Sequence, residues 1–286
     1  MAKLLRWTGY LLGGLVVLLL LAAAAVWLLS AQKLNARLAA KAERLAPMAQ
    51  ASAADGQHLI VTRACAECHG GPGLRGEKFL DIPNVVTLYA PNLSMVAKQA
   101  TDQQLAQAIR QGIGHDGRPL LIMPSESYAA FTDAEVAALI KAIRALPPGG
   151  SPTPAVSVGP LGRIGVVTGK VKTAPELIAD YARAPSLDLG PQHAAGRHIA
   201  ATVCSGCHGS NLAGKEAEPG TLAPDLTIAG AYDLPAFTRL LRTGKPASGR
   251  ELKMMSNVSR KAFSGFTDAE IAQLHAYLQE RAKRAS

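Results

Sequence analysis

The stretches C-A-E-C-H at residues 65–69 and C-S-G-C-H at residues 204–208 share the pattern C-x-x-C-H and contain all four cysteines of the 286-residue chain. Two thiols three residues apart on a helical turn can form thioether bonds with both vinyl groups of one haem, and the adjoining histidine then lies beneath the iron. The pattern occurs twice and uses every cysteine. The sequence therefore predicts two covalently bound haem c groups, attached at Cys65, Cys68, Cys204 and Cys207.

Three other uses of a C-x-x-C pair stay open at this point. A structural zinc site usually takes four ligands from two separated pairs, whereas each pair here has its own adjacent histidine. A thioredoxin-like redox motif needs a βαβ context, which the flanking sequence lacks. Two structural disulfides would suit an exported protein. Covalent haem accounts best for the cysteines and the histidines together.

An apolar segment dominates the beginning of the chain. Residues 10–29 carry no charge, and a helix of this length spans about 30 Å, the thickness of the hydrocarbon core of a bilayer. Trp7 and Trp27 lie near its two ends, as interfacial aromatic residues do. The run exceeds the apolar region of a cleaved signal peptide, about 7–15 residues. We therefore expect residues 1–30 to be an uncleaved transmembrane signal-anchor, with a cleaved signal peptide as the alternative.

Two connecting segments have distinct compositions. Residues 31–46 predict an amphipathic helix that ends at Pro47, within a helical stalk covering residues 31–53. Residues 147–190 are rich in proline and glycine. That composition predicts an extended connector laid over the surface rather than a third domain.

Residues 54–146 and 191–284 are two copies of one unit. In each copy a glycine-rich turn follows the C-x-x-C-H motif. An irregular apolar passage comes next, with A-P-N-L-S at residues 90–94 in the first copy and A-P-D-L-T at residues 223–227 in the second. The repeat therefore includes the loops as well as the cysteines.

Helical patterns follow these loops at matching places in both copies. Residues 102–111 and 234–243 each predict a helix, and Gly112 and Gly244 provide C-terminal stops. We find no stretch rich in β-formers that competes with the helical reading of either copy. Both copies are predicted to be helical with long loops.

The last helix of each copy begins with nearly the same sequence, F-T-D-A-E. Thr132 and Thr267 are predicted N-caps, and Glu135 and Glu270 stand where they complete a capping box. An apolar stripe at helical spacing should face the core of each copy. Its members are Val136, Leu139, Ile140 and Ile143 in the first copy and Ile271, Leu274 and Leu278 in the second.

These motifs resemble class I cytochrome c domains in tandem: a C-x-x-C-H near the start, a P-N-L or P-D-L loop, a methionine before the last helix and a capped terminal helix. The chain as a whole resembles the membrane-anchored dihaem cytochrome c proteins of bacteria, including cytochrome subunits that accept electrons from periplasmic dehydrogenases. The resemblance covers residues 54–146 and 191–284. It implies an all-α fold with two tandem cytochrome c-like helical domains after one N-terminal transmembrane helix.

The resemblance also implies the axial ligands of the two irons. His69 and Met123 would ligate the first haem iron, and His208 and Met255 the second. Ligation by histidine and methionine raises the reduction potential and fills both axial positions, which suits electron transfer. The second distal ligand has a rival in Met254, because Ser256 replaces the proline that follows Met123.

Other polar residues near the motifs have several readings. Arg118 and Arg250 are candidates to pair with haem propionates, since arginine binds carboxylates in a bidentate manner, and a solvated loop position is the other reading. His58 and His198 are equivalent in the repeat and are expected to be packing or surface histidines. His115 is an alternative distal ligand, although its G-H-D-G context predicts a loop.

The predicted function is electron transfer rather than enzyme catalysis. The carrier would link a periplasmic dehydrogenase or a quinol-oxidising complex to an acceptor such as a terminal oxidase, alone or as a subunit of a hetero-oligomeric complex. A net charge of +9 suits an anionic membrane surface or an acidic redox partner, whereas the 5% aromatic content and the lack of a basic motif argue against nucleic acid.

An alternative function is a dihaem peroxidase-like enzyme with an open distal site on one haem. A methionine before the last helix in both copies favours the carrier instead. Haem is attached outside the bacterial cytoplasm, so we expect a single-pass protein of the inner membrane with its haem domains in the periplasm.

Overall fold

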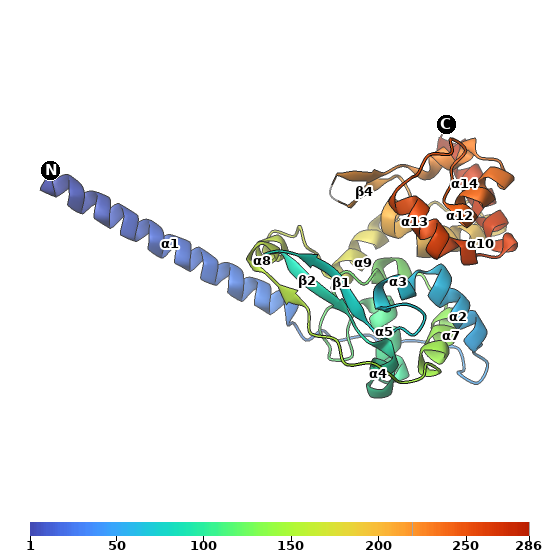
Figure 1. Cartoon of the computed structure of the whole chain (residues 1–286), viewed down its shortest axis with the longest axis horizontal. Helices are drawn as coiled ribbons and strands as arrows, with labels where there is room; N and C mark the ends of the chain where they lie inside the picture. The colour runs from blue at the N-terminus through green and yellow to red at the C-terminus, as the bar shows by residue number, and fades with distance from the viewer. Residues whose placement is uncertain (219, 286) are drawn as a thin grey trace.

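The computed structural model describes residues 1–218 and 220–285 (Figure 1). A long helix, α1 (Ala2–Leu34), projects from a body made of two helical domains. Domain 1 consists of the elements from α2 to α7, and domain 2 of those from α10 to α14, which end at the C-terminus. Helix α1 is long and apolar enough to cross a membrane.

The elements of domain 1 are α2 (Ala53–Thr62), α3 (Cys65–His69), β1 (Glu77–Ile82), β2 (Val86–Ala90), α4 (Leu93–Gln99), α5 (Asp102–Gln111), α6 (Ser125–Tyr128) and α7 (Asp133–Arg144). The segment between the domains holds β3 (Ser157–Val158), α8 (Pro160–Val167) and α9 (Ala174–Arg183). The elements of domain 2 are η1 (Pro191–His193), α10 (Ala194–Ile199), the π-helical η2 (Ala200–Cys204), α11 (Ser205–His208), β4 (Lys215–Glu218), β5 (Thr221–Ala223), η3 (Leu226–Ala231), α12 (Leu234–Thr243), α13 (Met254–Lys261), η4 (Phe263–Gly265) and α14 (Asp268–Ala285). The predicted all-α class with two repeated helical domains is confirmed, and the strands form only small antiparallel sheets.

Local sequence signals place the helix ends correctly. Gly112 (φ 65°) and Gly244 (φ 73°) adopt the left-handed conformation that ends α5 and α12, as predicted. Both T-D-A-E sequences form capping boxes, in which the threonine hydroxyl accepts from the glutamate N–H and the glutamate carboxylate accepts from the threonine N–H. The ends of these helices are therefore determined by residues that lie within a few positions of them in the sequence.

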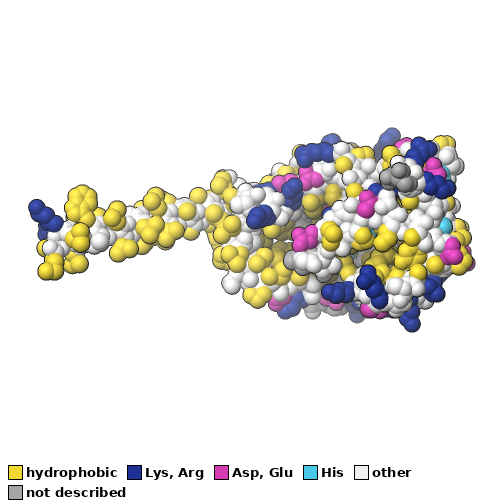
Figure 2. Space-filling view, turned by 90° about the horizontal axis from the view of Figure 1, so that it is seen from above, with side chains coloured by type: hydrophobic (Ala, Val, Ile, Leu, Met, Phe, Trp, Pro, Cys, Tyr) yellow, Lys and Arg dark blue, Asp and Glu magenta, His cyan; other side chains and the backbone are white. Residues whose placement is uncertain are grey.

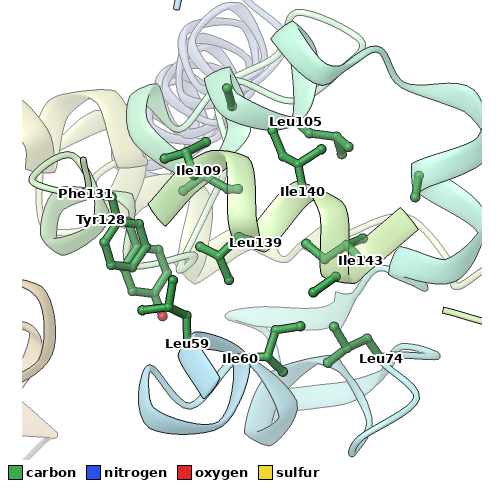
Figure 3. Close-up of a cluster of buried hydrophobic side chains, with 14 of the residues drawn as sticks. Leu59, Ile60, Leu74, Leu105, Ile109, Tyr128, Phe131, Leu139, Ile140 and Ile143 are labelled. Carbon is green, nitrogen blue, oxygen red and sulfur yellow. The ribbon is translucent and has the colours of Figure 1, made fainter. Parts of the chain in front are cut away.

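The core of each domain forms between its first and last helices. In domain 1, Leu59 and Ile60 of α2 lie opposite Leu139 and Ile140 of α7 (Figure 3). The rings of Tyr128 and Phe131 stack beside them with centroids 5.0 Å apart. Domain 2 repeats the arrangement with Phe263 and Phe266, whose ring centroids are 5.7 Å apart. The residues of both predicted apolar stripes are buried.

A glycine permits the close helix crossing in each domain. A Cβ atom added to Gly56 of α2 would lie 2.0 Å from the carbonyl oxygen of Ala138 in α7. At Gly196 of α10 the added atom would lie 2.1 Å from the carbonyl oxygen of Gln273 in α14. Any side chain would force the helices apart. The glycine two residues before His58 and His198 is therefore required by packing.

We predict that Gly56→Ala destabilises the protein by about 3 kcal/mol, because the new methyl group overpacks the crossing of α2 and α7. Urea denaturation of the purified holoprotein in detergent would measure the change. The matched control is Gly73→Ala, whose Cβ would meet only the flexible side chain of Arg75, at 3.3 Å. The control should stay within about 0.5 kcal/mol of the wild type. Equal stabilities of the two variants would contradict the packing argument.

The predicted helical stalk is wrong beyond the end of α1. Helix α1 ends at Leu34, and residues 36–46, here called the strap, run without helical structure along α5. The side-chain amides of Gln103, Gln107 and Gln111 exchange hydrogen bonds of 2.8–3.1 Å with the strap backbone. These glutamines lie one turn apart on one face of α5. They form hydrogen bonds with N–H and C=O groups of the strap that would bond to one another if the strap were a helix.

The connector is also more structured than its composition predicted. Helix α8 starts at Pro160, and α9 starts with a capping box formed by Thr173 and Glu176. Strand β3 adds to β2 as the third strand of a sheet. Proline in the first turn of a helix is favourable, because its missing N–H would have no helical partner there. Pro160 and Pro175 therefore lie in the first turns of helices, whereas the prolines at positions 147, 148, 152 and 154 lie in the non-helical stretch before β3.

Candidate haem-attachment sites

The two C-x-x-C-H motifs are reached by different backbone routes. The spacing from histidine to first cysteine is one residue longer between His58 and Cys65 than between His198 and Cys204. In domain 1 the extra residue is accommodated at Ala64, which adopts the left-handed conformation (φ 58°) directly before α3. In domain 2 the chain passes through the π-helical η2 directly into α11. Both routes bring the first cysteine against the apolar cluster of its own domain.

A backbone carbonyl orients each motif histidine. The Nδ1 atom of His69 lies 2.9 Å from the carbonyl oxygen of Pro91, and Nδ1 of His208 lies 2.7 Å from that of Pro224. A carbonyl oxygen only accepts, so Nδ1 carries the hydrogen and Nε2 keeps its lone pair. The repeated A-P-N-L-S and A-P-D-L-T loops thus fix the tautomer that an axial ligand needs.

Burial sets the protonation of the histidines and cysteines. Desolvation lowers the pKa of both His69 and His208, although the carbonyl hydrogen bonds oppose it, so both rings are neutral as iron ligation requires. Burial raises the pKa of Cys65 and Cys204 to about 12. These surroundings disfavour a thiolate and suit an uncharged thioether.

The predicted distal methionines lie in the same apolar clusters as the cysteines. Met123 packs against the cluster of domain 1 together with Cys65, and Met255 packs against that of domain 2 together with Cys204. Among the described residues, the domain 2 cluster includes Met255 and not Met254. Ile122, directly before Met123, has a φ of 63°. A β-branched residue rarely adopts this angle, so the surrounding fold must hold the methionine loop in place.

The donor set fits haem better than the other uses of these cysteines. Within residues 1–218 and 220–285, no three His, Cys, Asp or Glu side chains converge as a metal site built from protein ligands alone would require. The cysteines are thiols rather than disulfides. A neutral imidazole with its Nε2 lone pair available, a thioether sulfur beside an apolar cluster and two partly buried thiols are the groups that a c-type haem uses.

The candidate propionate ligands lie on the surface. Arg118 is about half exposed and pairs with Asp116 of its own loop, with 2.6 Å between Nη2 and Oδ2. Arg250 is exposed. His115 is also exposed, in the loop that its sequence predicted. A propionate role for the two arginines stays a prediction.

His58 and His198 join the two domains. Nε2 of His58 in domain 1 lies 2.9 Å from Oε1 of Glu270 in domain 2, and Nε2 of His198 in domain 2 lies 2.8 Å from Oε1 of Glu135 in domain 1. Each glutamate is also the capping-box residue of its last helix. The repeat therefore generates a reciprocal pair of hydrogen bonds across the interface, which explains why both copies carry the histidine.

Arg63 lies buried at this interface, and sequence reasoning did not identify it. The residue is 6% exposed, and its guanidinium carbon lies 5.7 Å from the ring centroid of Phe266 in domain 2. Nη1 donates to Thr62 at 3.0 Å, while Nε has no hydrogen-bond partner in the described structure. Burial raises the pKa of Cys65 and of Cys204, and the charge of Arg63 opposes the rise at both. A buried cation therefore acts on both motifs.

The interface glutamates predict a loss of stability in acid. Burial raises the pKa of Glu135 and Glu270, but hydrogen bonds from the histidines and threonines outweigh it, so both values lie below the ordinary 4.5. A lowered folded pKa stabilises the protein above the unfolded value, and this contribution is lost as the pH falls through the folded pKa. We expect this stabilisation to decline as the pH falls below 4.5, with a size set by charge-assisted hydrogen bonds that contribute about 1.5–3 kcal/mol each.

Urea denaturation as a function of pH tests this expectation. The double variant Glu135→Gln, Glu270→Gln should be less stable than the wild type at pH 7 and should converge with it in acid. Glu77→Gln makes the same charge change at an exposed position and should follow the wild-type curve. A constant difference between the wild type and the double variant at all pH values would contradict the assignment.

Two family models match the chain. The model for cytochrome c matches residues 193–282, and the model for subunit III of the cbb3-type cytochrome c oxidase matches residues 51–141. The two matches contain one C-x-x-C-H motif each and coincide closely with domains 2 and 1. A comparison with curated proteins gives no match. The chain thus has two cytochrome c domains, which imply two covalently bound c-type haems.

Proposed function

We propose that this chain, which belongs to the membrane-anchored dihaem cytochromes c, passes single electrons from a periplasmic dehydrogenase or quinol-oxidising complex to an acceptor such as a terminal oxidase. Haem-based electron transfer follows from the two cytochrome c domains. The observation that carries the proposal further is that each domain combines an oriented histidine with a partly buried methionine packed against the same apolar cluster as the first cysteine. Two ligands per iron leave no open position for a substrate.

Each residue has a defined part in this proposal. When bound, each haem supplies one-electron chemistry between ferric and ferrous iron. The cysteines of domain 1 would hold the first haem covalently, His69 would ligate its iron through Nε2, and Met123 would supply the second protein ligand. Their counterparts in domain 2 are the cysteines of the second motif, with His208 and Met255. The apolar clusters beside these residues would lower the local dielectric, which favours the less charged ferrous state.

Contacts between the domains support passage of electrons within the chain. Ala64, directly before the first cysteine, packs against the apolar cluster of domain 2. Ser127 of domain 1 and Ser205, inside the second motif, share a hydrogen bond of 2.8 Å. Both attachment motifs therefore border one interface. We propose that an electron enters at one haem and leaves from the other.

Partner and orientation are proposed from several features together. The model that matches domain 1 describes a subunit of an oxidase, which supports a terminal oxidase as the acceptor. The net charge of +9 favours an acidic docking surface on the partner. A periplasmic position follows from the place of haem attachment. The same features suit a subunit of a larger complex.

Low-temperature EPR and absorbance near the methionine–iron charge-transfer band test the ligation. The oxidised wild type should show two low-spin haems with methionine signatures. Met123→Ala and Met255→Ala should each convert one haem to the high-spin form, and Met254→Ala is the matched control that should convert neither. A high-spin haem in the wild type would overturn the carrier, because it would leave an iron open to substrate. Loss in Met254→Ala alone would move the second ligand to Met254.

A further inference from the structure

Helix α8 exposes apolar side chains instead of burying them. Leu161, Ile164 and Val167 are 57%, 47% and 39% exposed. At about 100° per residue they fall within a sector roughly 120° wide on one side of the helix. The opposite side is tightly packed, since Val166 is fully buried and a Cβ on Gly162 would lie 2.1 Å from the carbonyl oxygen of Val85. The exposed side of α8 is therefore the apolar one.

Helix α8 contacts α1 at the end of its apolar run. The guanidinium carbon of Arg163 lies 3.7 Å from the ring centroid of Trp27, and its Nη1 donates to Ser30 at 2.9 Å. Nζ of Lys33 donates to the carbonyl oxygen of Val166 at 3.3 Å. The apolar run of α1 ends at Leu29, directly before Ser30. These contacts fix α8 at the level where the hydrocarbon of a bilayer gives way to its headgroups.

The apolar surface continues beyond α8 onto the neighbouring sheet. Ile82, beside the turn between β1 and β2, and Val156, next to β3, are each 41% exposed. The backbone N–H of Leu161 donates to the carbonyl oxygen of Asn84 in that turn, at 3.0 Å. Figure 2 shows hydrophobic side chains gathered on the body where α1 joins it. Lys170, directly after α8, is exposed, and a lysine next to a bilayer favours anionic headgroups.

We infer that α8 is an interfacial membrane helix, whose residues Leu161, Ile164 and Val167 insert at the boundary of headgroups and acyl chains in the leaflet from which α1 emerges. The occupant is phospholipid, because the patch is continuous with the membrane end of α1 and has Arg163 and Lys170 beside it. The inference rests on α1 spanning the membrane, as in the proposed function, and adds a second contact. Two contacts hold domain 1 in one orientation against the bilayer.

Photocrosslinking of the full-length holoprotein in phospholipid nanodiscs tests the inference. The native cysteines carry haem, so a benzophenone maleimide labels only an introduced cysteine. Leu161→Cys and Ile164→Cys probe the patch, and Leu18→Cys probes the middle of α1. Ala54→Cys is the matched exposed control, on α2, which lies on the side of domain 1 away from α1 (Figure 1). Haem absorbance and circular dichroism confirm that each variant is folded.

We expect lipid adducts, read by mass spectrometry, at positions 161, 164 and 18, with yields at 161 and 164 at least tenfold above that at 54. Adducts at 18 alone would overturn the inference and leave the anchor intact. No adduct at 18 would overturn the anchor itself, and with it the inference. In native membranes, a protein adduct at 161 and 164 without a lipid adduct would show that a partner subunit covers the patch, which also overturns the inference.

Discussion

Replacing Cys204 and Cys207 with alanine will reduce the covalent haem content from two haems per chain to one. The first cysteines of the two motifs lie against separate apolar clusters, so domain 1 keeps its own attachment site. Pyridine haemochrome absorbance per chain and the intact mass of the protein measure the loss directly. The reciprocal variant, with Cys65 and Cys68 replaced, should give the same stoichiometry with the other haem retained.

Glu67→Gln is the matched control, because it changes the C-A-E-C-H motif without removing a thiol. It should retain both haems. A double-cysteine variant that still carries two covalent haems would contradict the assignment of these residues. Loss of both haems in a variant with wild-type helical content would show that the two attachments depend on each other.

Arg63→Met will lower the reduction potentials of both haems by roughly 40 mV, which is about 1 kcal/mol for one electron. Reduction adds negative charge at the iron, and a buried cation favours the reduced form. The charge of Arg63 acts on both Cys65 and Cys204, so the effect should appear at both centres. Methionine fills similar space without charge. A potentiometric titration that resolves the two haems measures the shifts.

Two variants separate charge from packing at this position. Arg63→Lys keeps the cation and should restore most of both potentials, although it loses the hydrogen bond from Nη1 to Thr62. Arg183→Met removes an arginine whose side chain is 76% exposed and should leave both potentials unchanged, because solvent screens it. If Arg63→Lys shifted the potentials as far as Arg63→Met, the effect would come from packing and not from charge.

The sequence predicts those parts of the structure in which cause and effect lie close together in the chain. Gly112 ends α5 because a left-handed residue is needed one position after the helix, and Glu135 caps α7 from three residues away. The spacing of the C-x-x-C-H motifs and the positions of the repeated A-P-N-L-S and A-P-D-L-T loops can likewise be read directly from the sequence. The carbonyl oxygens of Pro91 and Pro224 accept hydrogen bonds from the motif histidines, a role that the sequence alone does not show.

The sequence does not predict local structure that depends on hydrogen-bond partners far away in the chain. The strap is extended because three glutamines of α5, more than fifty residues away, bind its backbone. The hydrogen bonds of His58 and His198 cross between domains, and no local pattern predicts them. The helices of the connector are a different case, since T-A-P-E at residues 173–176 is a readable capping signal. The high proline content of residues 147–190 nevertheless favoured the prediction of an extended connector over that capping signal.

The strap has a consequence for how the protein meets its partners. A flexible linker of the same length would allow the haem domains an excursion of roughly 18 Å. Because the strap is bonded along α5, this freedom is absent between α1 and domain 1. The haem domains therefore move little relative to α1. They cannot carry electrons between distant complexes by swinging on a flexible tether. Exchange must rely on lateral diffusion of whole molecules in the plane of the bilayer, or on permanent neighbours, and its rate should depend on the surface density of the partner.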